Sequence, residues 1–326
     1  MFKGRLFAGL GVWLAIALGF YAAVYLQTTF TQGGNPHFFF HPENLSNLLG
    51  QAAVVGILAC GMTLIIVAGH IDLSVGSLLG MLGAMAAWLM SDYSGWGWNV
   101  AAAVAAVIVL GVLLGAAQGA LIAYLEIPSF VVTLGGLLVF RGVLLLVAKS
   151  TIPIEANFVT FLGSATFPGE GGFPVRFLLM LVLMLVVHTV AARTRFGRYL
   201  YAIGGNRQAA YYSGISVQKQ LVGAFALMGA IAGLAGLVFT GFQMAADAGA
   251  GDLMELYAIA ACVLGGTSLR GGKGSVPGAV VGALIMATIR NGLSCLGVPN
   301  SGEKIILGVI LVIAVASDIL LSRKKS

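Results

Sequence analysis

Ten long apolar runs constrain this chain more than any other feature of its sequence. Most of them approach the roughly 20 residues that a helix needs to cross a bilayer. They are too long and too continuous for strands, and a barrel that faces lipid would alternate with period two. The sequence therefore predicts an all-α, polytopic membrane protein with about ten transmembrane helices. The runs lie at about 6–27, 48–69, 73–90, 99–124, 129–147, 175–192, 220–242, 255–269, 277–291 and 304–321.

Composition supports the same class of protein. Charged residues make up 9% of the 326 residues, against roughly 25% in soluble domains, so there is too little polar surface to cover a core of this size. Glycine follows no three-residue period, which excludes a collagen-like chain. Cys60, Cys262 and Cys295 lie in apolar runs without metal-ligand spacing and are interpreted as packing residues. No catalytic residue, metal or cofactor is expected.

Basic residues predict the orientation. If the N-terminus is cytoplasmic, 12 of the 17 lysines and arginines lie on the cytoplasmic side, in agreement with the positive-inside rule. The loops expected on the other side, at 31–47, 91–98 and 243–254, contain no basic residue. Both termini are then cytoplasmic, and the net charge of +6 is explained by topology rather than by nucleic acid. The 12 residues are Lys3, Arg5, Arg193, Arg195, Arg198, Arg207, Lys219, Arg270, Lys273, Arg323, Lys324 and Lys325.

A carboxylate interrupts the apolar pattern in the segment 69–76 (GHIDLSVG), which joins two apolar runs almost without a linker. A carboxylate so close to hydrocarbon is costly unless it faces water or a partner. Two interpretations stand. Asp72 and Ser74 cap the helix that starts near Val75 by accepting its free N–H groups, or they contact a solute on its pathway. A cap beside the pathway would serve both roles.

A glycine-rich segment at 264–275 (LGGTSLRGGKGS) superficially resembles a phosphate-binding loop. The Walker pattern requires a glycine in place of Thr267 and a serine or threonine in place of Gly274, so no nucleotide site is predicted. A tight reversal between two helices is expected instead. A weak repeat relates 74–76 to 275–278, and two broken helices in corresponding halves of a chain would mark a pathway near the membrane midplane.

The loop 193–219 is the longest polar segment on the predicted cytoplasmic side. Within it Asn206 is a suitable N-cap and Gly214 a suitable C-terminal residue, which predicts a helix of about two turns between them. Such a helix has no core of its own. It either rests on lipid head groups or forms a knob for a cytoplasmic partner, in which case Ala209 and Ala210 allow close approach.

The segment 148–174, on the opposite side, predicts only a short lateral helix near 157–162. It is either an ordinary loop or a docking surface for an external partner. Arg141, in the preceding apolar run, either snorkels outward or pairs within the bundle.

Six stretches occur in order along the chain: GHIDLSVG at 69–76, PSFVVTL at 128–134, FRG at 140–142, TRFGR at 194–198, YAIGGN at 201–206 and the stretch 258–282. Together they resemble the permease subunits of ribose/xylose/galactose-type sugar ABC importers. The resemblance runs from about residue 44 to residue 321, and the stretches 259–269 and 291–299 are most similar to D-xylose permeases. The chain departs from the family pattern at Tyr257, where an acidic residue is usual, and at Arg270 and Lys273, where small residues are usual.

This resemblance implies one ten-helix permease domain over 1–326 in the bacterial cytoplasmic (inner) membrane. It implies three protein partners: a second permease copy, a cytoplasmic ABC ATPase that hydrolyses ATP, and a periplasmic sugar-binding protein. The expected cargo is a monosaccharide, with pentoses such as xylose or ribose first. With the motifs above, it places the pathway or gate at Asp72, Ser74, Gly76, Ser129, Thr133, Arg141, Glu255, Thr267 and Ser268, and the contacts to the ATPase at Arg195, Phe196, Gly197, Asn206, Ala209, Ala210 and Gly214.

A secondary transporter driven by an ion or proton gradient is the alternative class. Its acids within the membrane would be Asp72 and Glu255 alone. For an integral membrane enzyme, the sequence offers no Ser/His pair, paired carboxylates or metal spacing on neighbouring helices.

Overall fold

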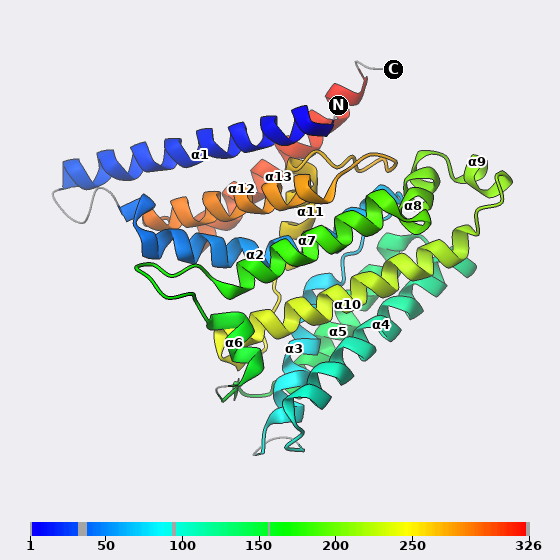
Figure 1. The fold of residues 1–326 in the computed structure, drawn as a ribbon, viewed down its shortest axis with the longest axis horizontal. Helices are drawn as coiled ribbons and strands as arrows, with labels where there is room; N and C mark the ends of the chain where they lie inside the picture. Colours follow the sequence, from blue (N-terminus) through cyan, green and yellow to red (C-terminus); the bar gives the residue numbers. More distant parts are fainter. Residues whose placement is uncertain (1, 32–37, 93–95, 156, 324–326) are drawn as a thin grey trace.

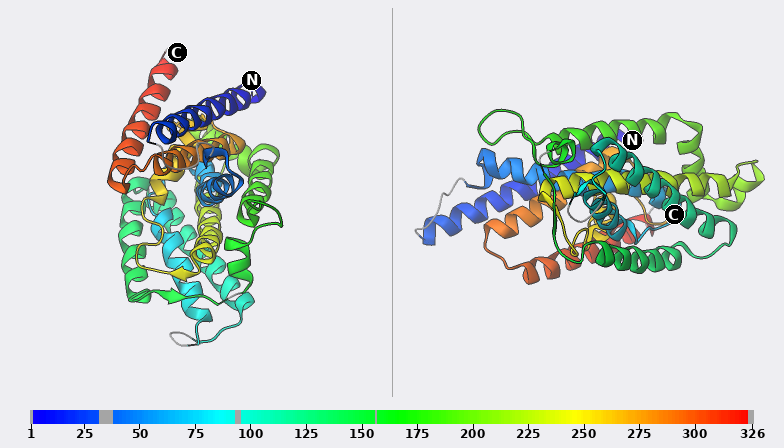
Figure 2. Two further views of the ribbon diagram at one scale, coloured as in Figure 1. Left: turned by 90° about the vertical axis from the view of Figure 1, so that its left-hand side faces the viewer. Right: turned by 90° about the horizontal axis from the view of Figure 1, so that it is seen from below.

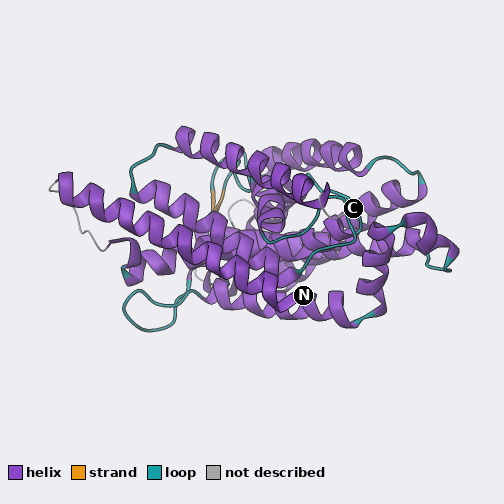
Figure 3. Ribbon diagram, turned by 90° about the horizontal axis from the view of Figure 1, so that it is seen from above, coloured by secondary structure: helices purple, strands orange, loops and turns teal. Residues whose placement is uncertain are grey.

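A computed structural model describes residues 2–31, 38–92, 96–155 and 157–323. Lys324 and Lys325, two of the residues used to predict the orientation, lie outside the described residues, as do parts of the loops 31–47 and 91–98. Each predicted apolar run contains a helix, so the all-α prediction is confirmed (Figure 1; Figure 3). The elements are α1 (Phe2–Thr31), η1 (Phe38–Phe40), α2 (Pro42–Val67), α3 (Val75–Met90), α4 (Val100–Tyr124), α5 (Ser129–Val147), β1 (Ile152–Pro153), α6 (Phe158–Ser164), α7 (Val175–Arg193), α8 (Arg195–Gly205), α9 (Arg207–Tyr212), α10 (Val217–Gln243), β2 (Ala245–Ala246), α11 (Met254–Leu264), α12 (Val276–Cys295) and α13 (Asn300–Arg323).

Among the described residues, 7 helices are long and apolar enough to cross a membrane: α1, α2, α4, α5, α7, α10 and α12. The apolar helices α3 and α11 are shorter. At 1.5 Å per residue, α11 rises about 16 Å, roughly half of the hydrocarbon thickness. The prediction that 255–269 spans the membrane as one helix is therefore wrong, because this helix ends at Leu264 and covers only part of the bilayer.

Helix α2 forms the centre of the bundle. Its apolar window is 94% buried, and it packs against α7, α10, α11 and α12 (Figure 2). The corresponding windows of α4 and α5 are only 22% and 17% buried. Large apolar side chains such as Leu138 and Leu146 of α5 therefore point out of the bundle. Such faces suit lipid or another membrane-spanning chain, because both are apolar surroundings in which these side chains carry no exposure penalty.

The bundle has two distinct ends, named here after the short helices that lie at each. At the α8 end, α8 and α9 extend beyond the long helices (Figure 1). At the α6 end, β1 pairs with β2 in antiparallel register, with Ile152 opposite Ala246. The predicted lateral helix near 157–162 is confirmed as α6, and the Asn157 side chain caps it by accepting the N–H of Val159 at 2.7 Å.

Candidate functional site

Two helices, α3 and α11, begin inside the bundle rather than at its surface. After α10 ends at the α6 end, the segment 244–253 turns back into the bundle and leads to α11. Gly251 of this segment packs on Gly76 of α3 so closely that a Cβ on Gly251 would overlap the Gly76 carbonyl oxygen. Gly76 lies near the start of α3, about 20 Å along the helix from its end at Met90. The segment 244–253 is therefore re-entrant.

The first turns of α3 and α11 meet inside the bundle, at the level of Gly76. Glu255, in the first turn of α11, is buried, and a Cβ on Gly76 would overlap its carboxylate. Broken helices whose N-termini meet within the bundle are typical of solute sites in membrane transporters. The weak sequence repeat identified the wrong partner for α3, because its second member, 275–278, begins the full-length helix α12 at the α8 end.

A buried polar cluster fills the space beside the start of α3, and we call Asp72, Ser74 and Gln118 the Asp72 cluster. Asp72 Oδ1 accepts hydrogen bonds from the Ser74 N–H at 2.8 Å and the Ser74 hydroxyl at 2.6 Å. The Gln118 Nε2 of α4 donates to Ser74 Oγ at 3.1 Å. All three side chains are at most 5% exposed. The cluster thus ties the α2–α3 connection to α4.

The predicted capping role of Asp72 and Ser74 is only partly right. The helix begins at Val75 as expected and Ser74 occupies the N-cap position, but the Ser74 side chain accepts no N–H group of the helix. Its hydroxyl is oriented toward Asp72 instead. The first turn of α3 is therefore left without a side-chain cap, and its partial positive charge faces the carboxylate of Glu255.

Two residues of α5 reach the same connection. Ser129 Oγ accepts the N–H of Ile71 at 3.4 Å. The buried Thr133 hydroxyl donates to Ser129 O at 2.9 Å and lies 3.5 Å from Ile71 O. Four of the predicted pathway residues, Asp72, Ser74, Ser129 and Thr133, thus come together around the α2–α3 connection.

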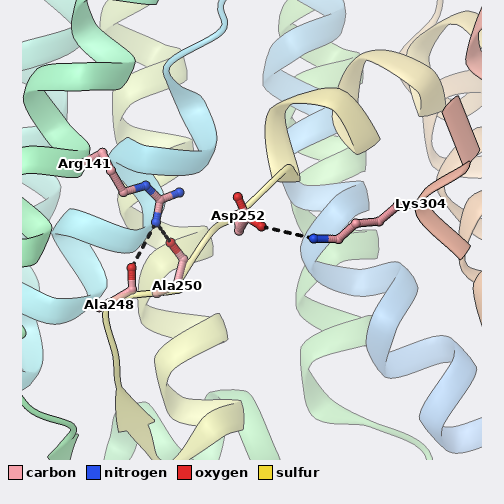
Figure 4. A network of polar contacts seen from close by, with 5 residues as sticks. All are labelled: Arg141, Ala248, Ala250, Asp252 and Lys304. Atoms are coloured by element: carbon pink, nitrogen blue, oxygen red, sulfur yellow. Dashed lines mark hydrogen bonds and ion pairs between the residues drawn. The ribbon is translucent and has the colours of Figure 1, made fainter. Parts of the chain in front are cut away.

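Arg141 of α5 pairs within the bundle, which decides between its two predicted positions. Its Nη1 donates to Ala250 O at 2.8 Å and to Ala248 O at 3.3 Å (Figure 4). Beyond these residues, Asp252 forms an ion pair with Lys304 of α13 at 3.7 Å. Arg141, Gly76 and Glu255, three of the predicted pathway residues, thus all lie around the re-entrant segment.

Thr267 and Ser268 lie elsewhere, in the loop that follows α11 at the α8 end. The loop is folded tightly by its glycines, and Ser268 N–H donates to Lys273 O at 2.9 Å. Thr267 is buried against Gly274. The length of α11 separates both residues from Glu255, so the nine predicted pathway residues form an inner group and a separate pair at one end.

This loop meets the end of α2 and the end of α8 in one contact region, which we call the glycine junction. Gly272 N–H donates to Val67 O at 2.8 Å, and the Tyr201 hydroxyl of α8 donates to Gly274 O at 2.9 Å. A Cβ on Gly204 would overlap Val67 O, so α8 rests directly on backbone. Burial raises the pKa of Tyr201 above its usual value, which keeps the phenol protonated as a donor.

The predicted helix between Asn206 and Gly214 is confirmed as α9. The Asn206 side chain accepts the N–H of Ala209 at 2.9 Å, Gly214 adopts a left-handed φ of 82°, and Ile215 N–H donates to Ala210 O at 3.1 Å. These bonds satisfy groups at both helix ends. The sequence reading missed α8, a separate helix whose apolar face, including Leu200 and Ile203, is buried against the bundle.

The seven predicted ATPase-contacting residues divide by exposure. Gly197 packs on the carbonyl oxygen of Ala191, and Ala210 is 4% exposed, so these two cannot contact a partner directly. Phe196 is half-buried and lies beside α10. The other four are exposed: Arg195, Asn206, Ala209 and Gly214.

Two features near these sites were not predicted from the sequence. Tyr211 and Tyr212 form an exposed aromatic pair on α9, 61% and 82% exposed with ring centroids 5.8 Å apart. Gln118 belongs to the Asp72 cluster. The available signals were two adjacent aromatic residues in a two-turn polar helix, and a lone amide in an otherwise apolar span, where polar side chains are costly.

Tyr257, where the family pattern usually has an acidic residue, contacts a cation in the structure. Arg290 of α12 forms a 2.6 Å ion pair with Glu303 of α13, and its guanidinium lies 4.8 Å from the centroid of the Tyr257 ring. The aromatic ring of α11 thus contacts a cation whose charge is balanced by α13.

A membrane-spanning helical bundle, with two broken helices that meet around buried polar groups, defines a polytopic transport protein. The family model described as "Branched-chain amino acid transport system / permease component" matches residues 44–315, and the chain belongs to this family of permeases. The resemblance stated from the motifs is confirmed by the relatives described next.

Three curated relatives are sugar permeases of Escherichia coli (strain K12). The chain is 38% identical to the xylose transport system permease protein XylH, with 91% of this chain and 89% of the relative covered. It is 40% identical to the ribose import permease protein RbsC, with 86% and 87% covered. It is 36% identical to the D-allose transport system permease protein AlsC, with 89% and 87% covered. No solved structure matches the chain.

Proposed function

We propose that this chain is the membrane-spanning permease subunit of an ATP-driven importer for a monosaccharide, with pentoses such as xylose or ribose as first candidates. The similarity to three sugar permeases over most of the chain carries this proposal. In it the chain is one non-catalytic permease domain, and a cytoplasmic ABC ATPase hydrolyses ATP. A periplasmic binding protein delivers the sugar, and a second copy of the chain completes the membrane part.

The proposed pathway runs beside the meeting point of α3 and α11. Hydroxyl side chains suit sugar hydroxyls because they both donate and accept hydrogen bonds, and carboxylates accept hydrogen bonds from sugar hydroxyls. Thr267 and Ser268 belong to the proposed exit at the α8 end. The inner group that would line the passage consists of Asp72, Ser74, Gly76, Ser129, Thr133, Arg141 and Glu255.

Uptake by proteoliposomes tests this function. Vesicles that contain the chain, its ATPase and the binding protein should accumulate radiolabelled xylose or ribose when ATP is supplied. Accumulation should persist with an uncoupler and stop when ATP is depleted. Uptake that follows an ion or proton gradient without ATP would instead identify a secondary transporter.

The orientation gives a first prediction. We place the α8 end and both termini in the cytoplasm, because the basic residues gather there. In intact cells, a membrane-impermeant maleimide should label the Ser164→Cys variant, at the α6 end. It should label Ser213→Cys, next to α9, only after permeabilisation. Reversed labelling of the two positions would contradict the orientation.

Asp72 gives a second prediction. Asp72→Asn keeps an oxygen that accepts from Ser74, so it should retain expression and most transport. Asp72→Leu leaves the buried Ser74 N–H without its acceptor, at about 1–3 kcal/mol, and leaves the Ser74 hydroxyl bonded to Gln118 alone, so it should express poorly. Expression and uptake are measured for both. Complete loss of uptake in two well-expressed variants would show that the charge itself is required.

A further inference from the structure

The re-entrant segment 244–253 is held differently at its two ends. At the outer end it is fixed by backbone, through the pairing of β2 with β1 and the bond from Ile154 N–H to Met244 O at 3.0 Å. In the inner half, 247–253, the backbone bonds are short-range turns, such as Ala250 N–H to Asp247 O. Side chains from other helices therefore decide where the inner half lies.

Arg141 is the main side-chain tether of the inner half. It reaches from α5 and donates to the carbonyl oxygens of Ala248 and Ala250, and Ala250 is only 2% exposed (Figure 4). The second tether, the ion pair between Asp252 and Lys304, is formed by side chains that are 62% and 49% exposed. Exposed ion pairs contribute little to stability. Of these two side-chain tethers, Arg141 is therefore the stronger.

The surface of α3 beneath the inner half is formed largely by glycines. The inner half lies on Gly76 and Gly80 of α3, and a Cβ on Gly80 would overlap the Ala250 carbonyl oxygen. At these positions the backbone of the inner half packs on the backbone of α3, with the Glu255 carboxylate beside Gly76 and the Leu144 side chain beside Gly80. Movement of the inner half away from α3 would uncover only the small buried side chain of Ala250 and the partly buried Leu253, while β2 stays fixed as a hinge.

We infer that residues 247–253 form a gate over the meeting point of α3 and α11, and that Arg141 is the positioning residue that holds this gate closed. The inference rests on the proposed function in one respect, that a solute passes this point. The gate opens from the α6 end, which is the side where the segment enters the bundle.

Hydrogen–deuterium exchange of the full chain in nanodiscs tests the tether without any transport assay. In Arg141→Met, exchange in 247–253 should become at least tenfold faster, while α2 and α12 stay as protected as in the wild type. Arg141→Lys should restore part of the protection, because an ammonium also donates to carbonyls. The matched control Lys304→Met should change exchange less than twofold. Unchanged exchange in Arg141→Met, or loss of protection that extends to α2 and α12, would overturn the assignment.

A reversible lock tests whether the segment must move. A short, reducible bis-methanethiosulfonate reagent is used to join the cysteines of the Asp252→Cys/Lys304→Cys double variant, which replaces the exposed ion pair between the inner half and α13. Both single variants are treated in parallel. Cross-linking should lower ATP-driven sugar uptake at least tenfold relative to the same protein before treatment, and reduction should restore it. Normal uptake by the cross-linked chain would show that the segment is static. If wild-type vesicles take up no sugar, the proposed function fails while the exchange result still stands.

Discussion

Ala209→Glu is expected to abolish both sugar uptake and co-purification with the ATPase while the chain still inserts and folds. Ala209 is exposed on α9, a short helix capped at both ends that lies beyond the membrane bundle. A longer, charged side chain at this position blocks a close-fitting partner without touching the core. Uptake and ATPase pull-down are measured on equally expressed protein.

Two neighbouring substitutions sharpen this experiment. Ala209→Ser adds one small polar atom and should keep both activities. Ala210→Glu places a carboxylate where the side chain is 4% exposed, so it should reduce expression rather than act on the partner alone. Wild-type uptake and pull-down in Ala209→Glu would contradict the coupling role and would leave α9 as a helix that merely rests on lipid.

Gly204→Ala is expected to separate ATP hydrolysis from transport. The added methyl group would overlap the Val67 carbonyl oxygen and must displace α8 from the glycine junction. Because this junction joins α8 to the ends of α2 and α11, movement of α8 and α9 would no longer reach the broken helices. Sugar uptake should fall at least tenfold, while the ATPase still binds and hydrolyses ATP.

The adjacent Gly205→Ala is the matched control, since a Cβ on Gly205 has no atom within 4 Å. Neither glycine has a positive φ, so backbone strain affects neither variant. Tyr201→Phe, which removes only the bond to Gly274, should lower the ratio of sugar transported to ATP hydrolysed in the same direction. An unchanged ratio in Gly204→Ala would exclude the junction as the link.

The features that could be predicted from the sequence depend on neighbours along the chain. The limits of α9 follow from Asn206 and Gly214, which act within a few residues of themselves. The start of α3 at Val75 was predicted correctly, although the side-chain cap on which that prediction rested does not form. The all-α class follows from runs of apolar residues, which need no knowledge of packing.

The features that could not be predicted depend on contacts between distant segments. Gly76 meets Gly251 across more than half of the chain, and no local pattern reports that pairing. Ser74 has the right residue type for a cap, yet its hydroxyl forms hydrogen bonds with Asp72 and Gln118 rather than with the free N–H groups of α3. Ala210 looks equivalent to Ala209 in the sequence, and only the packing of α9 on the bundle buries one and exposes the other.

The central position of α2 has a consequence for biosynthesis. Its neighbour α12 ends about 230 residues later in the chain, so at about 5–20 residues per second the ribosome needs on the order of tens of seconds to supply it. During that time α2 has to reside in lipid without the partners that later enclose it. Its mean hydropathy of 2.1 is close to the 2.4 of the peripheral helix α5. The side chains at the centre of the finished bundle thus also serve as a temporary lipid-facing surface while the rest of the protein is made.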